Sequence, residues 1–418
     1  MADQEKTAGD KILKGMAAGA QIRKGVHLLS AQGHVLVIEL PHSVVMVDCG
    51  RGGEQTRALL RELRAITEKP IETVCYSHGH GGYNFGVPAI RAHNHDRGDA
   101  PPTLVAQRNV KKRYDRYRAT DQFQRILGQM QFPGPRSKRS EDPYVDPDIT
   151  FDDHLVLHEE NPRVELLWAP SETDDALAVW LPETRVLYGG AATPGDAIPN
   201  IGTPLRTLRL TLRWAESLER MAALQPEILL TEFGAIIDGA PEVQKRLLQT
   251  AKALRWLREE VVSRLNRGLD EQEILADLHY PPELFEVPWM TPNYGSPDYI
   301  VRDLIREESG WWDRNPTTLH PAHPDAAAEA RYHALVEPEK IIARAKALAA
   351  EGEIQLALHV VDLVAEGPAS HSLVQEGRLL KAELCRLRAK EVRPYVSKAL
   401  YRSSAELLET GRSWKDLA

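Results

Sequence analysis

The sequence predicts an α/β protein in which two packed sheets carry helices on their outer faces, followed by an all-α region. Three observations lead to this fold class. Short β-branched runs alternate with amphipathic helices through the first part of the chain. Helices return after pairs of strands, as in layered folds. Beyond about residue 268 the strand signal fades while helical periodicity continues. We therefore predict one domain over residues 1–266 and an α-helical domain over residues 267–418.

The N-terminal strands are predicted from apolar, β-branched runs. His34–Leu40 and Ser43–Val47 flank a turn that contains proline, so we expect a hairpin. Glu54–Thr67 follows a glycine-rich loop and carries apolar residues at the 3.6-residue period of an amphipathic helix. Ile71–Tyr76 is predicted to be the next strand, and Pro101–Ala106 is expected to add another.

The middle of the chain returns to strands and ends in two long helices. Strands are expected at Val164–Ala169, Leu177–Leu181, Arg185–Gly189 and Glu227–Thr231. Pro204–Gln225 and Pro241–Asn266 show helical periodicity. Because these helices come after groups of strands, we expect them to cover the outer face of a second sheet.

Four amphipathic helices near the C-terminus follow one another with short connections. They are predicted at Pro338–Glu351, Glu353–Glu366, Ser372–Lys390 and Tyr395–Glu409. Consecutive helix pairs of this length are typical of TPR-like arrays. The apolar stripes of these helices are expected to form a core or a contact between two copies of the chain.

Composition and charge narrow the classes of function. Hydrophobic residues make up 42% and charged residues 27%, which is ordinary for a soluble globular enzyme. The net charge of −8 argues against a general nucleic-acid or anionic-membrane binder. Cys49, Cys75 and Cys385 are scattered and form no C-x-x-C motif, which favours a reducing compartment. With no signal peptide or membrane span recognised, we expect a cytoplasmic protein with a small-molecule substrate.

The segment Asn109–Ser140 is basic in an otherwise acidic chain. Its cationic residues are Lys111, Lys112, Arg113, Arg116, Arg118, Arg125, Arg136, Lys138 and Arg139. Tyrosine and phenylalanine residues are interspersed among them. Two interpretations stay open: a solvated helix followed by a loop, or a cap that covers a site and attracts an anionic substrate.

A candidate metal site begins in the glycine-rich stretch that follows the strand Ile71–Tyr76. His78 and His80 lie one residue apart, and positions i and i+2 of an extended segment share one side. An H-x-H motif alone is equally compatible with two polar loop histidines. Catalytic zinc sites use three protein ligands and an open position, and Glu172, just past a predicted strand, is the best candidate for the third.

Several stretches together resemble the metallo-β-lactamase superfamily, and more narrowly its alkyl-sulfatase-like branch. The residues that carry the resemblance include Tyr76–Pro88, Ser171–Pro182, Leu229–Gly239 and Gly310–Leu319. The resemblance implies an αββα sandwich with a metal at the edge of the sheets. It also implies a homodimer built on the helical region.

The chain departs from the family pattern at one of its two metal positions. In the family loop H-x-H-x-D-H, the aspartate position is Gly82 here and the last histidine position is Tyr83. The acid expected after the strand Arg185–Gly189 falls at Ala191, and the final histidine falls at Phe233. The resemblance therefore implies that the second metal position has lost its ligands.

The other metal position keeps a complete set of ligands. His78, His80 and Glu172 remain, which predicts a mononuclear site. Two histidines and one carboxylate suit one divalent metal, either zinc with an activated water or Fe(II) of the two-histidine, one-carboxylate kind. The identity of the ligands does not choose between these metals.

Five further residues are candidates for the chemistry. Tyr83 could donate a proton or hydrogen bond to substrate, or it could fill the vacated space. Glu232 and Asp196 could act as a general base, or they could be solvated loop acids. Asn200 and Arg206 fall near a stretch that contacts anions in the sulfatase branch, so they are candidate substrate ligands. An arginine on a helix surface is the alternative for Arg206.

Three further acidic positions are expected to support the ligands or their loops. Asp48 aligns with an acid that braces the histidine loop in the family. Asp174 and Asp175, next to Glu172, are expected to orient neighbouring groups or to cap a turn.

Three functions are weighed on these grounds. The first is a metal-dependent hydrolase or lyase that acts on a small anionic or amphipathic substrate through metal-activated water. The second is a non-haem Fe(II) oxygenase-type enzyme on the same fold. The third is a metal-poor pseudoenzyme that acts as a binding or assembly protein, since fold alone does not carry activity.

Overall fold

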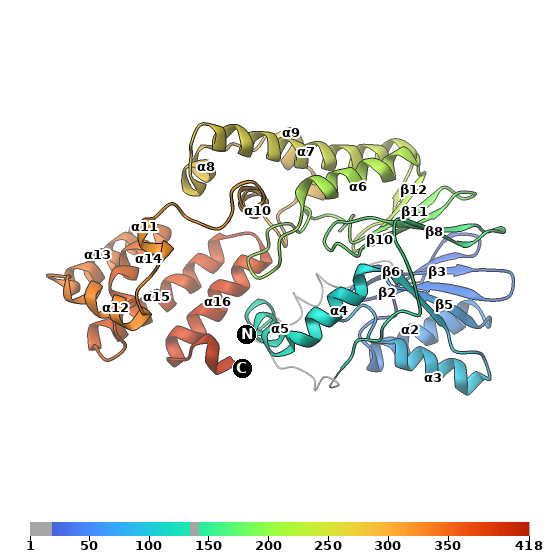
Figure 1. Cartoon of the computed structure of the whole chain (residues 1–418), viewed down its shortest axis with the longest axis horizontal. Coiled ribbons are helices and arrows are strands. Elements are labelled where there is room, and N and C mark those ends of the chain that lie inside the picture. Colours follow the sequence, from blue (N-terminus) through green and yellow to red (C-terminus); the bar gives the residue numbers. More distant parts are fainter. Residues whose placement is uncertain (1–18, 134–141, 418) are drawn as a thin grey trace. The chain divides into compact units, whose positions relative to one another are not determined.

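The computed structural model describes residues 19–133 and 142–417. Contacts within the chain group it into two compact units. The first comprises residues 1–120 and 136–309, and it contains both sheets. The second comprises residues 121–135 and 310–418, and it is helical (Figure 1).

The first sheet has its seven strands in chain order. They are β1 (Ala20–Arg23), β2 (Val26–Ala31), β3 (Gly33–Glu39), β4 (Val44–Val47), β5 (Ile71–Cys75), β6 (Thr103–Gln107) and β7 (Ile149–Phe151). The strands from β1 to β4 pair antiparallel, whereas those from β4 to β7 pair parallel. The carboxyl ends of β4 and β5 therefore lie at the same edge.

The second sheet has six strands in the order β13-β12-β11-β10-β9-β8. They are β8 (His154–His158), β9 (Val164–Trp168), β10 (Leu177–Leu181), β11 (Val186–Gly190), β12 (Ile228–Thr231) and β13 (Ile237–Asp238). Strands β9 and β11 both run antiparallel to β10, and β12 is parallel to β11. The carboxyl ends of β9, β11 and β12 thus share an edge.

Alternation along the strands divides the core into layers. In β3, Leu36 and Ile38 face the second sheet, whereas Val35 and Val37 face the helices on the outside. The outer face of the first sheet packs against α2 (Gly53–Ile66), α3 (Val87–Arg97) and α4 (Asn109–Ala119). The outer face of the second packs against α6 (Thr211–Ala223) and α7 (Ala240–Asn266), joined by α8 (Glu271–Asp277), α9 (Pro282–Phe285) and α10 (Pro297–Ser309). The predicted αββα fold class is confirmed.

The second unit is built from stacked helices. It holds α5 (Asp121–Gln131), α11 (Pro316–Leu319), α12 (Pro324–His333), α13 (Pro338–Ala350), α14 (Ile354–Ala365), α15 (Ser372–Glu391) and α16 (Tyr395–Thr410). One apolar core runs through α13–α16, as the periodicity of their sequence predicts. Ser403 on α16 donates a hydrogen bond to the Met130 carbonyl of α5 at 2.8 Å, and Phe132 stacks on Tyr395.

The two units divide the chain differently from the sequence prediction. We predicted a boundary between residues 266 and 267, yet α8–α10 pack with α7 in the first unit. The helix α5 lies far earlier in the sequence but packs in the second unit. No helix among residues 19–133 and 142–417 combines the length and apolar character needed to cross a bilayer.

One helix begins later than predicted, and the reason is visible in its neighbours. The predicted helix Pro204–Gln225 is helical only from Thr211, where α6 begins. The backbone N–H of Arg209 donates to Asp303 of α10 at 3.1 Å, and that of Thr211 donates to Glu307 at 3.0 Å. These two carboxylates hold the preceding residues as an extended loop, which runs past the candidate site.

Candidate metal centre and its pocket

The two histidines of the H-x-H motif lie side by side in the loop after β5. His78 is fully buried, and its Nε2 atom is 3.1 Å from Nδ1 of His80. The Ser77 hydroxyl lies 2.9 Å from Nδ1 of His78, which leaves Nε2 directed at His80. Burial lowers the pKa of His78 to about 4, and burial together with the neighbouring His78 lowers that of His80. Both rings are therefore neutral near pH 7, the form that binds a metal.

Glu172 reaches the same point from the second sheet, in the loop that follows β9. Its Oε1 atom is 3.8 Å from Nδ1 of His80, and the ligand atoms of the three residues lie within 4.8 Å of one another. Ligand atoms on a tetrahedral metal are roughly 3.4 Å apart for bonds of about 2.1 Å. The spacing of His78, His80 and Glu172 thus fits one divalent cation.

Arg209 is a member of this cluster that sequence reasoning missed. Its guanidinium lies 3.2 Å from Oε1 of Glu172, and its side chain is only 5% exposed. Asn200 donates to the same oxygen at 2.6 Å. Arg209 was placed inside the predicted helix Pro204–Gln225, so its position on an extended loop was not foreseen. Together, Arg209 and Asn200 fix the orientation of the Glu172 carboxylate.

Asp48 forms hydrogen bonds with the loop that carries the two histidines, as the family pattern implied. Its Oδ1 atom accepts hydrogen bonds from the Ser77 backbone N–H at 2.8 Å and from the Asn84 amide at 2.9 Å. Burial raises the pKa of Asp48 to about 7, and its Oδ2 atom is buried without a hydrogen-bond partner. The residue adopts a positive φ of 66°, which turns the chain sharply at the end of β4.

Buried side chains fill the space beside His78, where the resemblance implied that a second metal position had lost its ligands. The Tyr83 hydroxyl donates to Oε1 of Glu232, and both residues are buried. The Tyr83 ring packs 4.3 Å from that of His78, measured between centroids. A Cβ atom at Gly82 would collide with the Gln32 side chain, so an aspartate does not fit there without rearrangement. Burial, reinforced by the charge of Glu172, raises the pKa of Glu232 well above its usual range.

The remaining predicted residues occupy different places around this centre. Asp196 is half exposed and pairs with Arg246 of α7 at 3.1 Å. Arg206 lies on the loop before α6, and its charge contributes to the lowered pKa of His80. Asn200 contacts Glu172 instead of lining the neighbouring pocket. Among the predicted catalytic residues in the described part of the chain, only Tyr83 and Glu232 contact each other.

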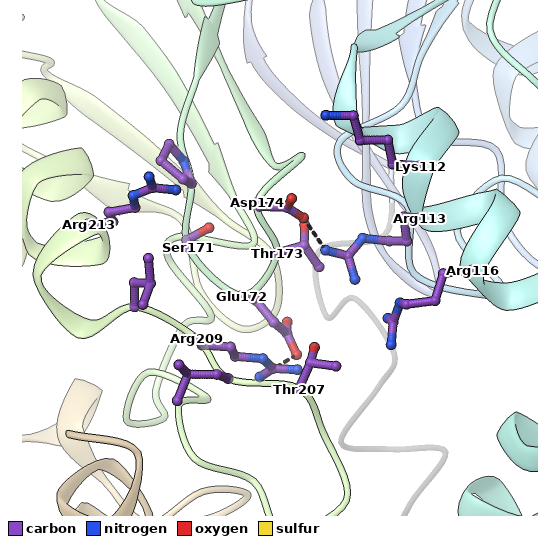
Figure 2. A pocket seen from close by; sticks show the side chains of 13 residues that line it. Lys112, Arg113, Arg116, Ser171, Glu172, Thr173, Asp174, Thr207, Arg209 and Arg213 are labelled. Atoms are coloured by element: carbon purple, nitrogen blue, oxygen red, sulfur yellow. Dashed lines mark hydrogen bonds and ion pairs between the residues drawn. The ribbon is translucent and has the colours of Figure 1, made fainter. Parts of the chain in front are cut away.

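A cavity of about 460 Å³ opens beside Glu172 (Figure 2). Its charged lining residues are Lys112, Arg113, Arg116, Arg209 and Arg213, against Glu172 and Asp174. Arg113 is neutralised by Asp174 and by Asp175, which accepts from its Nε at 2.9 Å.

Apart from Arg113 and Arg209, the cations that line this cavity carry an uncompensated positive charge. Lys112, Arg116 and Arg213 have no carboxylate partner within residues 19–133 and 142–417. Lys112 and Arg116 come from α4, so part of the basic segment Asn109–Ser140 does line the pocket. Residues 134–141 of that segment lie outside the described residues.

Replacing Tyr83 with phenylalanine should destabilise the protein. The variant would leave Oε1 of Glu232 without its donor in a buried site, where Oε2 already has none. The expected loss is about 1–3 kcal/mol in the free energy of unfolding, measured by denaturant titration. Glu232→Gln keeps an acceptor for the tyrosine, so it should cost less. Equal denaturant midpoints for Tyr83→Phe and the parent would contradict a stabilising hydrogen bond between Tyr83 and Glu232.

Asp48→Asn should remove a pH dependence of stability. The folded pKa of about 7 lies above the usual 3.8, so the folded state binds more protons between these values. The stability contributed by Asp48 is complete below about pH 4 and falls toward pH 7, by at most about 1.4 kcal/mol per pH unit. The free energy of unfolding should be measured from pH 4.5 to 8. As the pH rises, the value for Asp48→Asn should increase relative to that of the parent. Parallel curves would show that Asp48 does not titrate in this range.

Comparisons with known proteins agree with this architecture. A model of the metallo-beta-lactamase superfamily matches residues 31–232, and a model of the alkyl sulfatase dimerisation region matches residues 270–411. The matched helical region begins near the predicted boundary, whereas the compact units divide after residue 309. The boundary at residue 267 stays a prediction.

Similar sequences and structures carry sulfatase names. A linear primary-alkylsulfatase of a Pseudomonas strain is 28% identical over 305 residues, 69% of this chain and 58% of the relative. An alkyl/aryl-sulfatase of Saccharomyces cerevisiae is 22% identical over 363 residues, 81% of this chain and 56% of the relative. The chain therefore spans little more than half the length of these curated relatives.

A solved structure shows the same fold over nearly the whole chain. The stereoselective inverting sec-alkylsulfatase of a Pseudomonas species superposes with a TM-score of 0.81 and 18% identity, over 95% of this chain and 66% of that one. The chain is thus similar to the metallo-β-lactamase superfamily over residues 31–232 and to the alkyl sulfatase dimerisation family over residues 270–411.

Proposed function

We propose that this chain is a metal-dependent hydrolase that acts on a small organic anion at a single-metal site. One observation carries the proposal: His78, His80 and Glu172 converge beside a pocket whose uncompensated charges are positive. Metal ligands and anion-binding groups are thus neighbours, as hydrolysis of an anionic ester requires. A bound divalent metal, zinc or Fe(II), would lower the pKa of a water molecule and supply the nucleophile.

The chain's own residues would prepare the ligands for that metal. Burial keeps His78 and His80 neutral, so their nitrogen lone pairs are available near pH 7. Asn200 and Arg209 both contact Oε1 of Glu172, and they limit how the carboxylate can rotate. The hydrogen-bonded pair Tyr83 and Glu232 fills the neighbouring position, which supports a single metal instead of two.

The lining of the pocket favours an amphipathic substrate. Lys112, Arg116 and Arg213 provide charge for an anionic head group. Leu208 and Leu210 line the same pocket and are each 39% exposed, which provides apolar surface for an alkyl or aryl part. The relatives are named alkylsulfatases, so a sulfate ester of an alcohol is the substrate class to test first.

The C-terminal helices support a homodimer as the working form. The region that matches the alkyl sulfatase dimerisation model spans residues 270–411. We assign the role of partner to a second copy of this chain.

A second candidate function is a metal-poor binding protein. It is favoured by the contact between Arg209 and Glu172, because a guanidinium already neutralises the carboxylate that the metal would use. In that case the pocket would bind an organic anion without turnover. Metal content and activity separate the two functions.

His80→Ala should remove one equivalent of bound metal and abolish hydrolysis. Protein purified without added metal should contain about one equivalent of zinc or iron at this site by elemental analysis. Release of inorganic sulfate from octyl or dodecyl sulfate should fall by at least about 100-fold in the variant. His95→Ala, an exposed histidine of α3, is the matched control.

The two readouts of this experiment discriminate among the functions. Iron content with oxygen consumption would favour the Fe(II) oxygenase-type alternative. A parent protein that contains no more metal than His80→Ala after incubation with zinc and iron, and binds alkyl sulfates without cleaving them, would replace the hydrolase with the binding protein.

Removing pocket cations should weaken substrate binding more than turnover. Lys112→Ala and Arg116→Ala each remove a positive charge that lines the pocket and has no carboxylate partner among the described residues. Each is expected to raise KM by roughly 5–10-fold at low salt, with a smaller effect at high salt because exposed charges are screened. Lys111→Ala, an exposed neighbour outside the lining, is the control. An unchanged KM in both pocket variants would contradict the anion-binding role.

A further inference from the structure

A second group of metal-ligating side chains lies within the helical unit. Glu329 and His333 are one helical turn apart on α12, so they share a face of that helix. His371 precedes the first turn of α15 and meets them there. The ligand atoms of all three lie within 4.8 Å of one another.

We propose that Glu329, His333 and His371 bind a zinc ion that ties α12 to the start of α15. Two imidazoles and a carboxylate are ligands that zinc prefers over magnesium or calcium, which favour oxygen atoms alone. A water molecule would complete the tetrahedron.

The geometry needs only small side-chain movements to accept the ion. Oε2 of Glu329 is 3.3 Å from Nε2 of His333, close to the roughly 3.4 Å expected between ligand atoms on a tetrahedral metal. The ligand atom of His371 lies within 4.8 Å of the other two, so it has to approach them by at most about 1.4 Å. The side chains of Glu329 and His333 are 48% and 69% exposed, so neighbouring atoms leave them room to adjust.

One ligand of the group is already held in place by packing. The Tyr332 ring stacks on that of His371 with centroids 4.5 Å apart. Gly367 makes this possible, because a Cβ atom there would lie 2.8 Å from the Tyr332 ring. An imidazole that is ordered before the ion arrives loses less conformational freedom on binding.

The helix that carries the other two ligands is held by few contacts. No residue of α12 is fully buried, and the partly buried Tyr332 packs against the core of the helical unit. An exposed ion pair between Arg331 and Glu366 links the helix to the end of α14, and exposed ion pairs contribute little to stability. A zinc ion bound by both α12 and His371 would add a second connection to that of Tyr332, so the order of α12 should increase when the metal binds.

The test counts zinc on the full-length protein. Equilibrium dialysis at micromolar zinc, followed by elemental analysis, should show one equivalent fewer for His371→Phe than for the parent. Phenylalanine preserves the stacking on Tyr332 while removing the ligand nitrogen. Glu329→Gln should weaken zinc binding at least 10-fold, and His359→Ala, an exposed histidine of α14, should leave it unchanged.

A second readout reports on the helix itself. Amide hydrogen exchange over residues 324–333 should slow on addition of zinc, and EDTA should reverse this in the parent. His371→Phe should show no zinc effect. Equal zinc content and equal exchange in the parent and His371→Phe would overturn the proposal, and so would an equal loss in His359→Ala. Because only His80→Ala removes zinc from the candidate metal centre, the failure of one site is distinguishable from the failure of the other.

Discussion

The candidate metal centre depends on one buried carboxylate that joins the two sheets. Oδ2 of Asp175 accepts a hydrogen bond from the backbone N–H of Gly79 at 2.9 Å, and Oδ1 accepts from Nε of Arg113 at 2.9 Å. Asp175 is fully buried and lies three residues after Glu172. It therefore connects the loop of the two histidines, the loop of the third ligand and helix α4. A Cβ atom at position 79 would collide with this carboxylate, which requires glycine between the two histidines.

The contacts of Tyr83 and Glu232 follow the physics of buried polar groups. A buried carboxylate or imidazole without a partner carries the full cost of its desolvation. Here the Tyr83 hydroxyl is paired with Glu232, and burial favours the protonated form of that acid. Gln32 occupies the space beside Gly82 and donates to the Gly81 carbonyl at 3.0 Å. Tyr83 and Glu232 thus form a neutral, hydrogen-bonded pair, and the Tyr83 ring packs against His78.

The layered fold and the convergence of His78, His80 and Glu172 could be predicted from the sequence, because both follow from local patterns. Strand alternation places Leu36 and Ile38 on the opposite face of β3 from their neighbours. A histidine pair after one strand and an acid after another converge when those strands end at the same edge of the two sheets. Arg209 was missed because what holds its loop extended is Asp303, which lies far along the chain. The cluster of Glu329, His333 and His371 was missed for the same reason: the i, i+4 pair is visible locally, but His371 arrives through tertiary packing.

The cations around the pocket divide into those that hold the structure and those that remain to act on a ligand. Asp174 and Asp175 neutralise Arg113, and Glu172 neutralises Arg209, whereas Lys112, Arg116 and Arg213 have no carboxylate partner in the described part of the chain. A divalent cation held by Glu172 would share that carboxylate with Arg209 and leave part of the arginine's charge uncompensated. The pocket would then become more positive, and an organic anion would bind it more tightly. Since coupling between two binding events is reciprocal, a bound anion would in turn strengthen the hold of Glu172, His78 and His80 on the metal. A metal bound at Glu172 beside this basic pocket would therefore favour having metal and anion present together over having either one alone.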